Sequence, residues 1–265
     1  MAGENRRVLA LMPHPDDMEI LCAGTLIRLR NAGWEIHVAT MTPGDKGSAT
    51  LPSEEIAAIR RAEARRGAAV IGATGFYCLE FADCEIVFEN TTRRRVAGLL
   101  RTIDPFLIFT TPPDDYMLDH EITSRLVRDA CFNAPIRNYP AEEGQAGPSS
   151  GIPYLYYTDA IEGHDIFGQP SRVTCTVDIA AQIEQKVAAL ACHDSQRSWL
   201  QKQHGMDNYI ESMKRWSAGR GQEIGVAYGE AFCQHRGHPH PADDLLAHLL
   251  DGNTAAGRGL STQTE

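Results

Sequence analysis

The sequence predicts an α/β protein with a Rossmann-like, doubly wound, mostly parallel sheet and helices on both faces. Two observations support this fold class. The first 110 residues alternate short apolar runs of strand length with longer segments of helical period. The first of these runs, VLALM at 8–12, is apolar throughout, which is typical of a strand buried on both faces of a parallel sheet. Such alternation implies right-handed βαβ crossovers.

Each element of the first half has its own signal. Glycines after the first two helical segments, Gly33 and Gly72, mark helix ends. The runs WEIHVATM and FLIFT have the β-branched and aromatic content of strands. Strands are therefore expected at 8–12, 34–41, 76–79 and 106–110, and helices at 20–31, 54–71 and 91–102.

The second half continues the sheet after a polar loop at 135–152 that is rich in Pro, Gly, Ser and Glu. Strands are expected at 154–158 and 172–178, and helices at 120–133, 179–191 and 208–217. We expect a single α/β domain over residues 1–251. The remainder, 252–265, has few large apolar residues and is expected to be a disordered tail.

Composition excludes several classes of partner. Lys and Arg number 25 and Asp and Glu 35, so the formal charge is 25 − 35 = −10, which argues against nucleic-acid binding. No apolar stretch approaches the roughly 20 residues of a spanning helix, so no membrane insertion is expected. Seven cysteines, an odd number with no C-x-x-C pair, indicate reduced thiols. We expect a cytoplasmic protein.

Two polar segments follow predicted strands and carry metal-ligand chemistry. The turn PHPDD after the first strand offers His14 and Asp17, good ligands for Zn²⁺ or Fe²⁺, and leaves Asp16 to face a water. His120 follows the fourth strand and supplies a third ligand, and the preceding Asp119 would orient a neighbouring imidazole. Strand carboxyl ends meet at one edge of the sheet, so a 2-His-1-carboxylate site is expected there. The alternative is structural: an Asx-capped turn at 14–17 and a surface histidine at 120.

The same segments resemble a known family. PHPDD with Gly24-Thr25-Leu26 in the next helix is similar to the signature of the PIG-L or LmbE-like metal-dependent N-deacetylases. The resemblance continues through TPGDKGS at 42–48, Arg60-x-x-Glu63, DYMLDHEITSRLV at 115–127, AALACHDSQ at 188–196 and YGEAF at 228–232. It covers nearly the whole chain.

The resemblance implies roles position by position. His14, Asp17 and His120 would bind zinc, with Fe²⁺ as the other candidate, and Asp16 would be the general base. Many members carry a histidine three residues before the third ligand, where it stabilises the transition state or protonates the leaving group. This chain has Met117 there, and a thioether carries no proton to give.

The expected reaction is hydrolysis of an N-acetyl group on a small amino sugar. Arg60 would anchor the substrate through its planar fork, or else form a helix ion pair with Glu63. Tyr116 would donate to the oxyanion or simply pack. His193 would help with proton transfer or hold loops together. The histidines at 235, 238 and 240 have ligand-like spacing, although a surface loop is the expected setting.

Two other functions stay open from the sequence. The ligand set alone also fits a 2-His-1-carboxylate Fe(II) oxygenase, although those enzymes usually use an antiparallel double-sheet barrel. Met117 would equally suit a non-catalytic, metal-containing binder of amino sugars. A homo-trimer or homo-hexamer is expected from the family resemblance.

Overall fold

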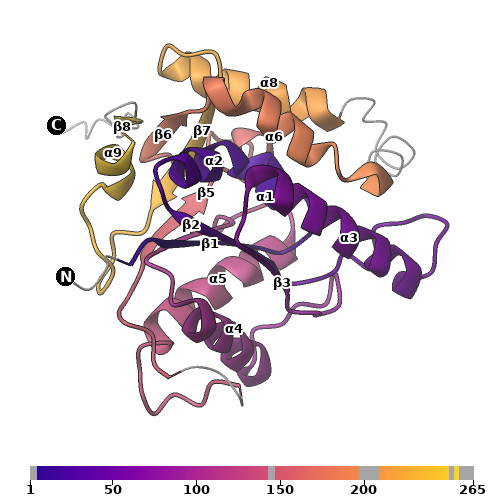
Figure 1. The fold of residues 1–265 in the computed structure, drawn as a ribbon, viewed down its shortest axis with the longest axis vertical. Helices are drawn as coiled ribbons and strands as arrows, with labels where there is room; N and C mark the ends of the chain where they lie inside the picture. Colours follow the sequence, from indigo (N-terminus) through magenta and orange to yellow (C-terminus); the bar gives the residue numbers. More distant parts are fainter. Residues whose placement is uncertain (1–4, 143–146, 197–208, 251–253, 257–265) are drawn as a thin grey trace.

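The computed structural model describes residues 5–142, 147–196, 209–250 and 254–256. Eight strands form one sheet in the order β3-β2-β1-β4-β5-β7-β6-β8 (Figure 1). The strands are β1 Arg7–Met12, β2 Glu35–Thr40, β3 Gly75–Cys78, β4 Leu107–Thr110, β5 Tyr154–Thr158, β6 Cys175–Asp178, β7 Gly229–Gln234 and β8 Thr254–Ala256. The five strands from β3 to β5 run parallel, and β7, β6 and β8 are added antiparallel. The mostly parallel, doubly wound sheet is confirmed.

Helices cover both faces of the sheet, and each face has its own hydrophobic core. Helices α4 and α5 pack together on one face, whereas α2, α3, α6 and α8 lie on the other (Figure 1). The helices are α1 Asp17–Leu21, α2 Ala23–Asn31, α3 Ser53–Ile71, α4 Asn90–Ile103, α5 Leu118–Asn133, α6 Ile183–Leu190, α8 Tyr209–Glu223 and α9 Leu245–Leu249, with 3₁₀ turns η1 Ile161–Gly163 and η2 Ala180–Gln182.

The order of the strands reverses between β1 and β4. From β1 the chain moves outward to β2 and β3, and then returns to the other side of β1 with β4 and β5. Ligands of doubly wound sheets bind in the crevice at the carboxyl ends of the two strands at such a point. The segments that follow β1 and β4 are therefore the expected place for a functional site.

The helix predicted at 20–31 is two helices. It begins earlier, at Asp17, and breaks at Cys22, whose φ of −147° and ψ of 5° are not helical. The break gives α2 its own N-terminus, and the Glu230 carboxylate accepts the backbone N–H groups of Gly24 and Thr25 there, at 2.9 and 2.7 Å. A carboxylate satisfies the free N–H groups and the positive end of a helix. The break is thus stabilised by a residue more than 200 positions away.

Two further differences concern the C-terminal part. The structure adds β7 between β5 and β6, where no strand was predicted. Of the tail predicted to be disordered, residues 254–256 form β8 beside β6, and the others lie outside the described residues. Within the described residues, every helix is too short or too polar to cross a lipid bilayer.

Candidate active site

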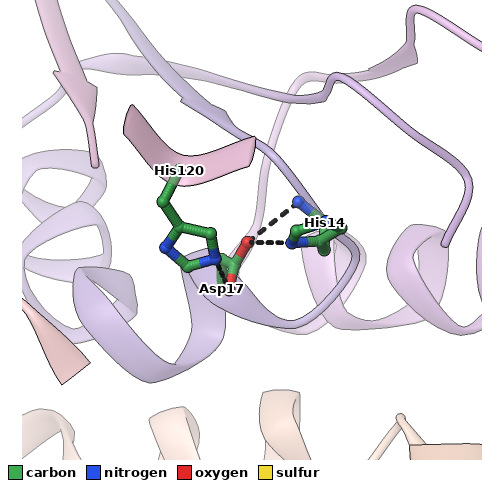
Figure 2. A group of neighbouring side chains, drawn as sticks. All are labelled: His14, Asp17 and His120. Atoms are coloured by element: carbon green, nitrogen blue, oxygen red, sulfur yellow. Dashed lines mark hydrogen bonds and ion pairs between the residues drawn. The ribbon is translucent and has the colours of Figure 1, made fainter. Parts of the chain in front are cut away.

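Three side chains that are far apart in the sequence meet at the switch point. His14 follows β1, Asp17 opens α1, and His120 lies in the first turn of α5 after β4. One ligand atom of each lies within 4.8 Å of the others, and all three side chains are buried. Figure 2 shows the two imidazoles on either side of the Asp17 carboxylate. The structure brings the predicted ligand set together.

The spacing of these atoms fits a cation better than direct hydrogen bonds. Asp17 Oδ2 lies 3.4 Å from His14 Nδ1, and Asp17 Oδ1 lies 3.7 Å from His120 Nε2 (Figure 2). Hydrogen bonds are normally shorter, at about 2.7–3.2 Å. Ligands held about 2.0–2.1 Å from a tetrahedral zinc ion stand about 3.3 Å apart. His120 Nε2 is also enclosed and has no hydrogen-bond partner within the described residues.

Further aspartates lie close to the outer nitrogen of each imidazole, with a hydrogen bond at His120 Nδ1 and ion-pair distances without one at His14 Nε2. Asp115 Oδ2 lies 2.9 Å from His120 Nδ1, while Asp83 Oδ1 lies 3.0 Å from His14 Nε2. Asp119 lies 3.4 Å from that same His14 nitrogen and accepts the Cys84 backbone N–H at 2.7 Å. A carboxylate behind an imidazole fixes the ring and its tautomer for metal binding. Asp119 thus lies beside His14, and His120 is oriented by Asp115, which the sequence analysis did not single out.

The surrounding carboxylates set the protonation of the two histidines. Burial lowers the pKa of His14, but Asp119, Asp17 and Asp83 outweigh it, so the pKa is raised well above 6.5. Burial also lowers the pKa of His120, and Asp17 with Asp115 reverses the shift. Both imidazoles therefore hold a proton more strongly than a free histidine does, and a metal ion must compete with it.

Asp16 lies beside Asp17 and lines the same cavity. Its backbone has φ 101°, a left-handed conformation that costs energy for a residue with a side chain. Burial raises the pKa of the Asp16 carboxyl, and the charge of Asp17 adds to this, against the opposing effect of Arg60 and His193. A carboxyl with a raised pKa is a stronger base than an ordinary aspartate, as general-base catalysis requires.

Arg60, on α3, is only 4% exposed and holds the turn that carries Asp16. Its Nη2 donates to the Pro15 carbonyl at 2.8 Å and lies 3.4 Å from Asp16 Oδ2, and its Nη1 donates to the Gly44 carbonyl at 3.1 Å. Glu63 instead accepts hydrogen bonds from the Ser195 backbone N–H and hydroxyl. The ion pair between Arg60 and Glu63 considered from the sequence is thus replaced by contacts with the active-site turn.

The cavity above the three ligands has a volume of about 530 Å³. Met117 lines it, as does Tyr116, whose exposed ring meets the His120 ring edge-on with 5.1 Å between centroids. The wall also includes Trp216 from α8 and Ile161 from η1, which sequence reasoning missed. The other lining residues are His14, Asp16, Asp17, Ile20, Lys46, Gly47, Arg60, Asp83, Cys84, Glu162, Gln196 and Tyr209.

The other histidines that the sequence suggested as candidates are not part of this cavity wall among the described residues. His193 is fully buried, and its Nε2 lies 3.0 Å from Glu19 Oε1 on α1. His235 and His240 contact each other with 4.5 Å between ring centroids. Both line another hollow next to α5, together with His238. The structure thus gives none of these histidines a place among the described residues that line the metal cavity.

A protein-family model and a related bacterial protein both match this chain. The family model described as PIG-L, GlcNAc-PI de-N-acetylase, matches residues 9–131, which include all three proposed ligands. The uncharacterized deacetylase YaiS of Escherichia coli K12 is 32% identical over 160 residues, which cover 58% of this chain and 80% of that protein.

Two solved structures resemble the whole fold. The N,N'-diacetylchitobiose deacetylase of Pyrococcus horikoshii is 26% identical, with a TM-score of 0.73 over 91% of this chain and 89% of its own. The hydratase GalB of Pseudomonas putida has the same TM-score of 0.73 at 20% identity, over 91% of this chain and 99% of its own. A likeness at that identity shows only the shared fold, so the reaction must be argued from the site.

Proposed function

Because the chain belongs to the PIG-L (GlcNAc-PI de-N-acetylase) family, we propose that it is a zinc-dependent hydrolase that removes an N-acetyl group from a small amino sugar. The products are acetate and the free amine. The observation that supports this most directly is the buried group of His14, Asp17 and His120 with Asp16 in the same cavity. The similarity to a diacetylchitobiose deacetylase supports an N-acetylglucosamine derivative as the substrate class.

His14 Nδ1, Asp17 and His120 Nε2 would hold the metal ion, and Fe²⁺ is the alternative to Zn²⁺ for this donor set. A bound ion supplies Lewis acidity that polarises the amide carbonyl and lowers the pKa of water. Asp115 fixes the His120 ring through the hydrogen bond with its outer nitrogen, and Asp83 and Asp119 lie beside the outer nitrogen of His14. The imidazoles then present their inner nitrogens to the same point.

Asp16 serves as the general base. Its carboxylate faces the cavity next to the ligand Asp17, and it takes the proton of the attacking water. Arg60 keeps the Asp16 turn in place through the Pro15 carbonyl. Arg60 and Tyr116 both line the cavity, and we propose that they also contact the substrate. Arg60 would contact polar groups of the substrate, and the exposed Tyr116 would contact it at the open rim of the cavity.

The leaving amine needs a proton, and Met117 supplies none. Asp16 is a carboxylic acid once it has taken the proton of water, and it lies in the same cavity as the scissile bond would. We therefore assign both transfers to Asp16, first as base and then as acid.

Acetate release tests this proposal. Metal-free protein is reloaded with one equivalent of Zn²⁺ and incubated with N-acetylglucosamine derivatives, and acetate and free amine are measured with and without O₂. We expect equal amounts of both products, independent of O₂. Asp16→Asn should lower turnover at least 100-fold with its zinc content unchanged. Product formation that needs O₂ would instead support the iron-oxygenase alternative, which rested on the ligand set alone.

A non-catalytic binder is the second candidate, because Met117 lines the cavity at the usual histidine position. In that case the zinc-loaded protein binds an N-acetylated sugar, measured by calorimetry, and releases no acetate. A Met117→His variant that gains activity from an inactive parent would support this view. An active parent excludes it.

The cellular setting and the assembly are further parts of the proposal. We propose that the enzyme acts in the cytosol, in keeping with its seven free thiols, which form no disulfide. We also propose a homo-trimer or homo-hexamer, by analogy with the family. Light scattering after size-exclusion chromatography measures the mass of the assembly directly.

A further inference from the structure

One polar group of the cavity has no role in the scheme above. Tyr209, the first residue of α8, is 7% exposed and lines the cavity together with Asp16 and Arg60. Its hydroxyl oxygen is enclosed, and it forms no hydrogen bond of standard geometry with the described residues. A buried hydroxyl without a partner loses its hydrogen bonds to water without replacement, so this arrangement needs a reason.

The Asp16 carboxylate is the acceptor to which this hydroxyl can donate a hydrogen bond. Within the described residues, the Asp16 carboxylate forms an ion pair with Arg60 Nη2 at the long distance of 3.4 Å. Its backbone is held at φ 101°, so the side chain depends on tertiary contacts to stay in place. Tyr209 and Asp16 line the same cavity, so the enclosed hydroxyl has this carboxylate available as an acceptor.

The hydroxyl also keeps its proton. Burial raises the pKa of Tyr209 well above 10, and the negative charge of Asp16 raises it further. Tyr209 is therefore a neutral donor throughout the physiological range. A neutral phenol that donates to a carboxylate makes a short, charge-assisted hydrogen bond.

We propose that Tyr209 is a positioning residue for the general base: its hydroxyl donates a hydrogen bond to the Asp16 carboxylate, as a second donor beside the Arg60 guanidinium. The inference rests on the proposed function through the role of Asp16. With two donors on one carboxylate, the oxygen that takes the proton of water is held in one orientation. Without the hydroxyl, Arg60 alone holds Asp16 at long range.

The first test compares Tyr209→Phe with Tyr157→Phe. Tyr157 is buried to a similar extent, but its hydroxyl meets His235 Nδ1 at 3.1 Å, outside the described lining of the cavity. Tyr209→Phe should lower kcat about 10-fold while KM stays within twofold, and Tyr157→Phe should leave both unchanged. Zinc content should be the same in all three proteins. A kcat of Tyr209→Phe within twofold of the parent overturns the proposal.

A double-mutant cycle separates positioning of Asp16 from a direct contact with substrate. If Tyr209 acts through Asp16, then Tyr209→Phe has no further effect in the Asp16→Asn background. If the hydroxyl donates to the substrate oxyanion instead, the two losses multiply. Multiplication of the losses overturns the proposal.

A structural measurement does not depend on activity. In a crystal structure of the zinc-loaded protein, Tyr209 Oη should lie about 2.5–2.8 Å from an Asp16 oxygen. An Oη more than 3.5 Å away, or bonded elsewhere, overturns the inference even in an active deacetylase. A wild-type protein that releases no acetate but shows this hydrogen bond refutes the proposed function and leaves the contact established.

Discussion

Glu230→Gln should be among the most destabilising polar substitutions in the chain, although Glu230 lies outside the active site. Its carboxylate is the meeting point of three donors: the Lys186 ammonium at 2.6 Å and the backbone N–H groups of Gly24 and Thr25. The side chains of Lys186 and Glu230 are each 1% exposed. These contacts join α6 and β7 to the first turn of α2, directly behind the metal-binding turn.

The magnitude follows from what glutamine can offer. An amide has one acceptor oxygen and one NH₂ group, so at least one of the three donors would face another donor. Removing one charge of a buried pair leaves the other unpaired, which costs about 3–5 kcal/mol. With an unfolding entropy of about 2.1 cal/mol/K per residue, the 265 residues give about 0.56 kcal/mol/K. The melting temperature should therefore fall by about 5–9 °C.

Urea and thermal unfolding, followed by far-UV circular dichroism, measure this loss on metal-free protein. Lys186→Met in the Glu230→Gln background removes the unpaired ammonium and should restore about 2 kcal/mol or more of the loss. The exposed pair of Arg61 and Glu80, at 2.6 Å, offers a matched control, because Glu80→Gln should cost less than about 1 kcal/mol. A loss below 1 kcal/mol for Glu230→Gln, or no recovery in the double variant, would refute this reasoning.

Three further outcomes are expected. Asp115→Asn should weaken zinc binding about 10- to 100-fold in a chelator competition, because the carboxylate that orients His120 is lost; unchanged affinity would count against that role. Zinc affinity should fall as pH falls from above the ordinary histidine range, because the pKa values of His14 and His120 are raised; affinity that is flat until pH 6 would contradict this. Gly44→Ala should destabilise the fold by about 1–3 kcal/mol and lower turnover, because φ is +70° and the new Cβ collides with the Arg60 guanidinium; a neutral result in both assays would remove Arg60 from the Asp16 turn.

Local patterns predicted most of the fold correctly, and they failed where distant residues decide. The strand at 154–158 and the helix that ends at Gly72 match the structure, because alternation and a glycine stop are local signals. The break at Cys22 was missed, because the carboxylate that stabilises the new helix start comes from Glu230. β7 was missed as well, since GEAFCQ carries the polar Glu230 and Gln234 at buried positions and becomes a strand by pairing with β5 and β6 on either side.

The same distinction applies to the site. The turn with His14 and Asp17 was found because both ligands lie in one short segment after a buried strand. Asp119 was predicted to lie beside an imidazole, but Asp115 and Asp83 were not assigned, although Asp115 lies five residues before His120 and Asp83 follows β3 at the same edge of the sheet. Which of several aspartates meets a given imidazole depends on side-chain directions that spacing does not contain. Tyr209 had no local signal.

The negative charge around the proposed metal ligands favours the binding of a cation. Five carboxylates converge on two imidazoles and one buried guanidinium, that of Arg60: Asp16, Asp17, Asp83, Asp115 and Asp119. Burial lowers the pKa values of His14 and His120, but the negative charge of these carboxylates outweighs burial and raises both. A divalent ion that displaces two protons leaves the total charge unchanged and places it between three ligands instead of on two rings. The negative charge of the carboxylates around the imidazoles can therefore be balanced either by two protons or by one divalent ion.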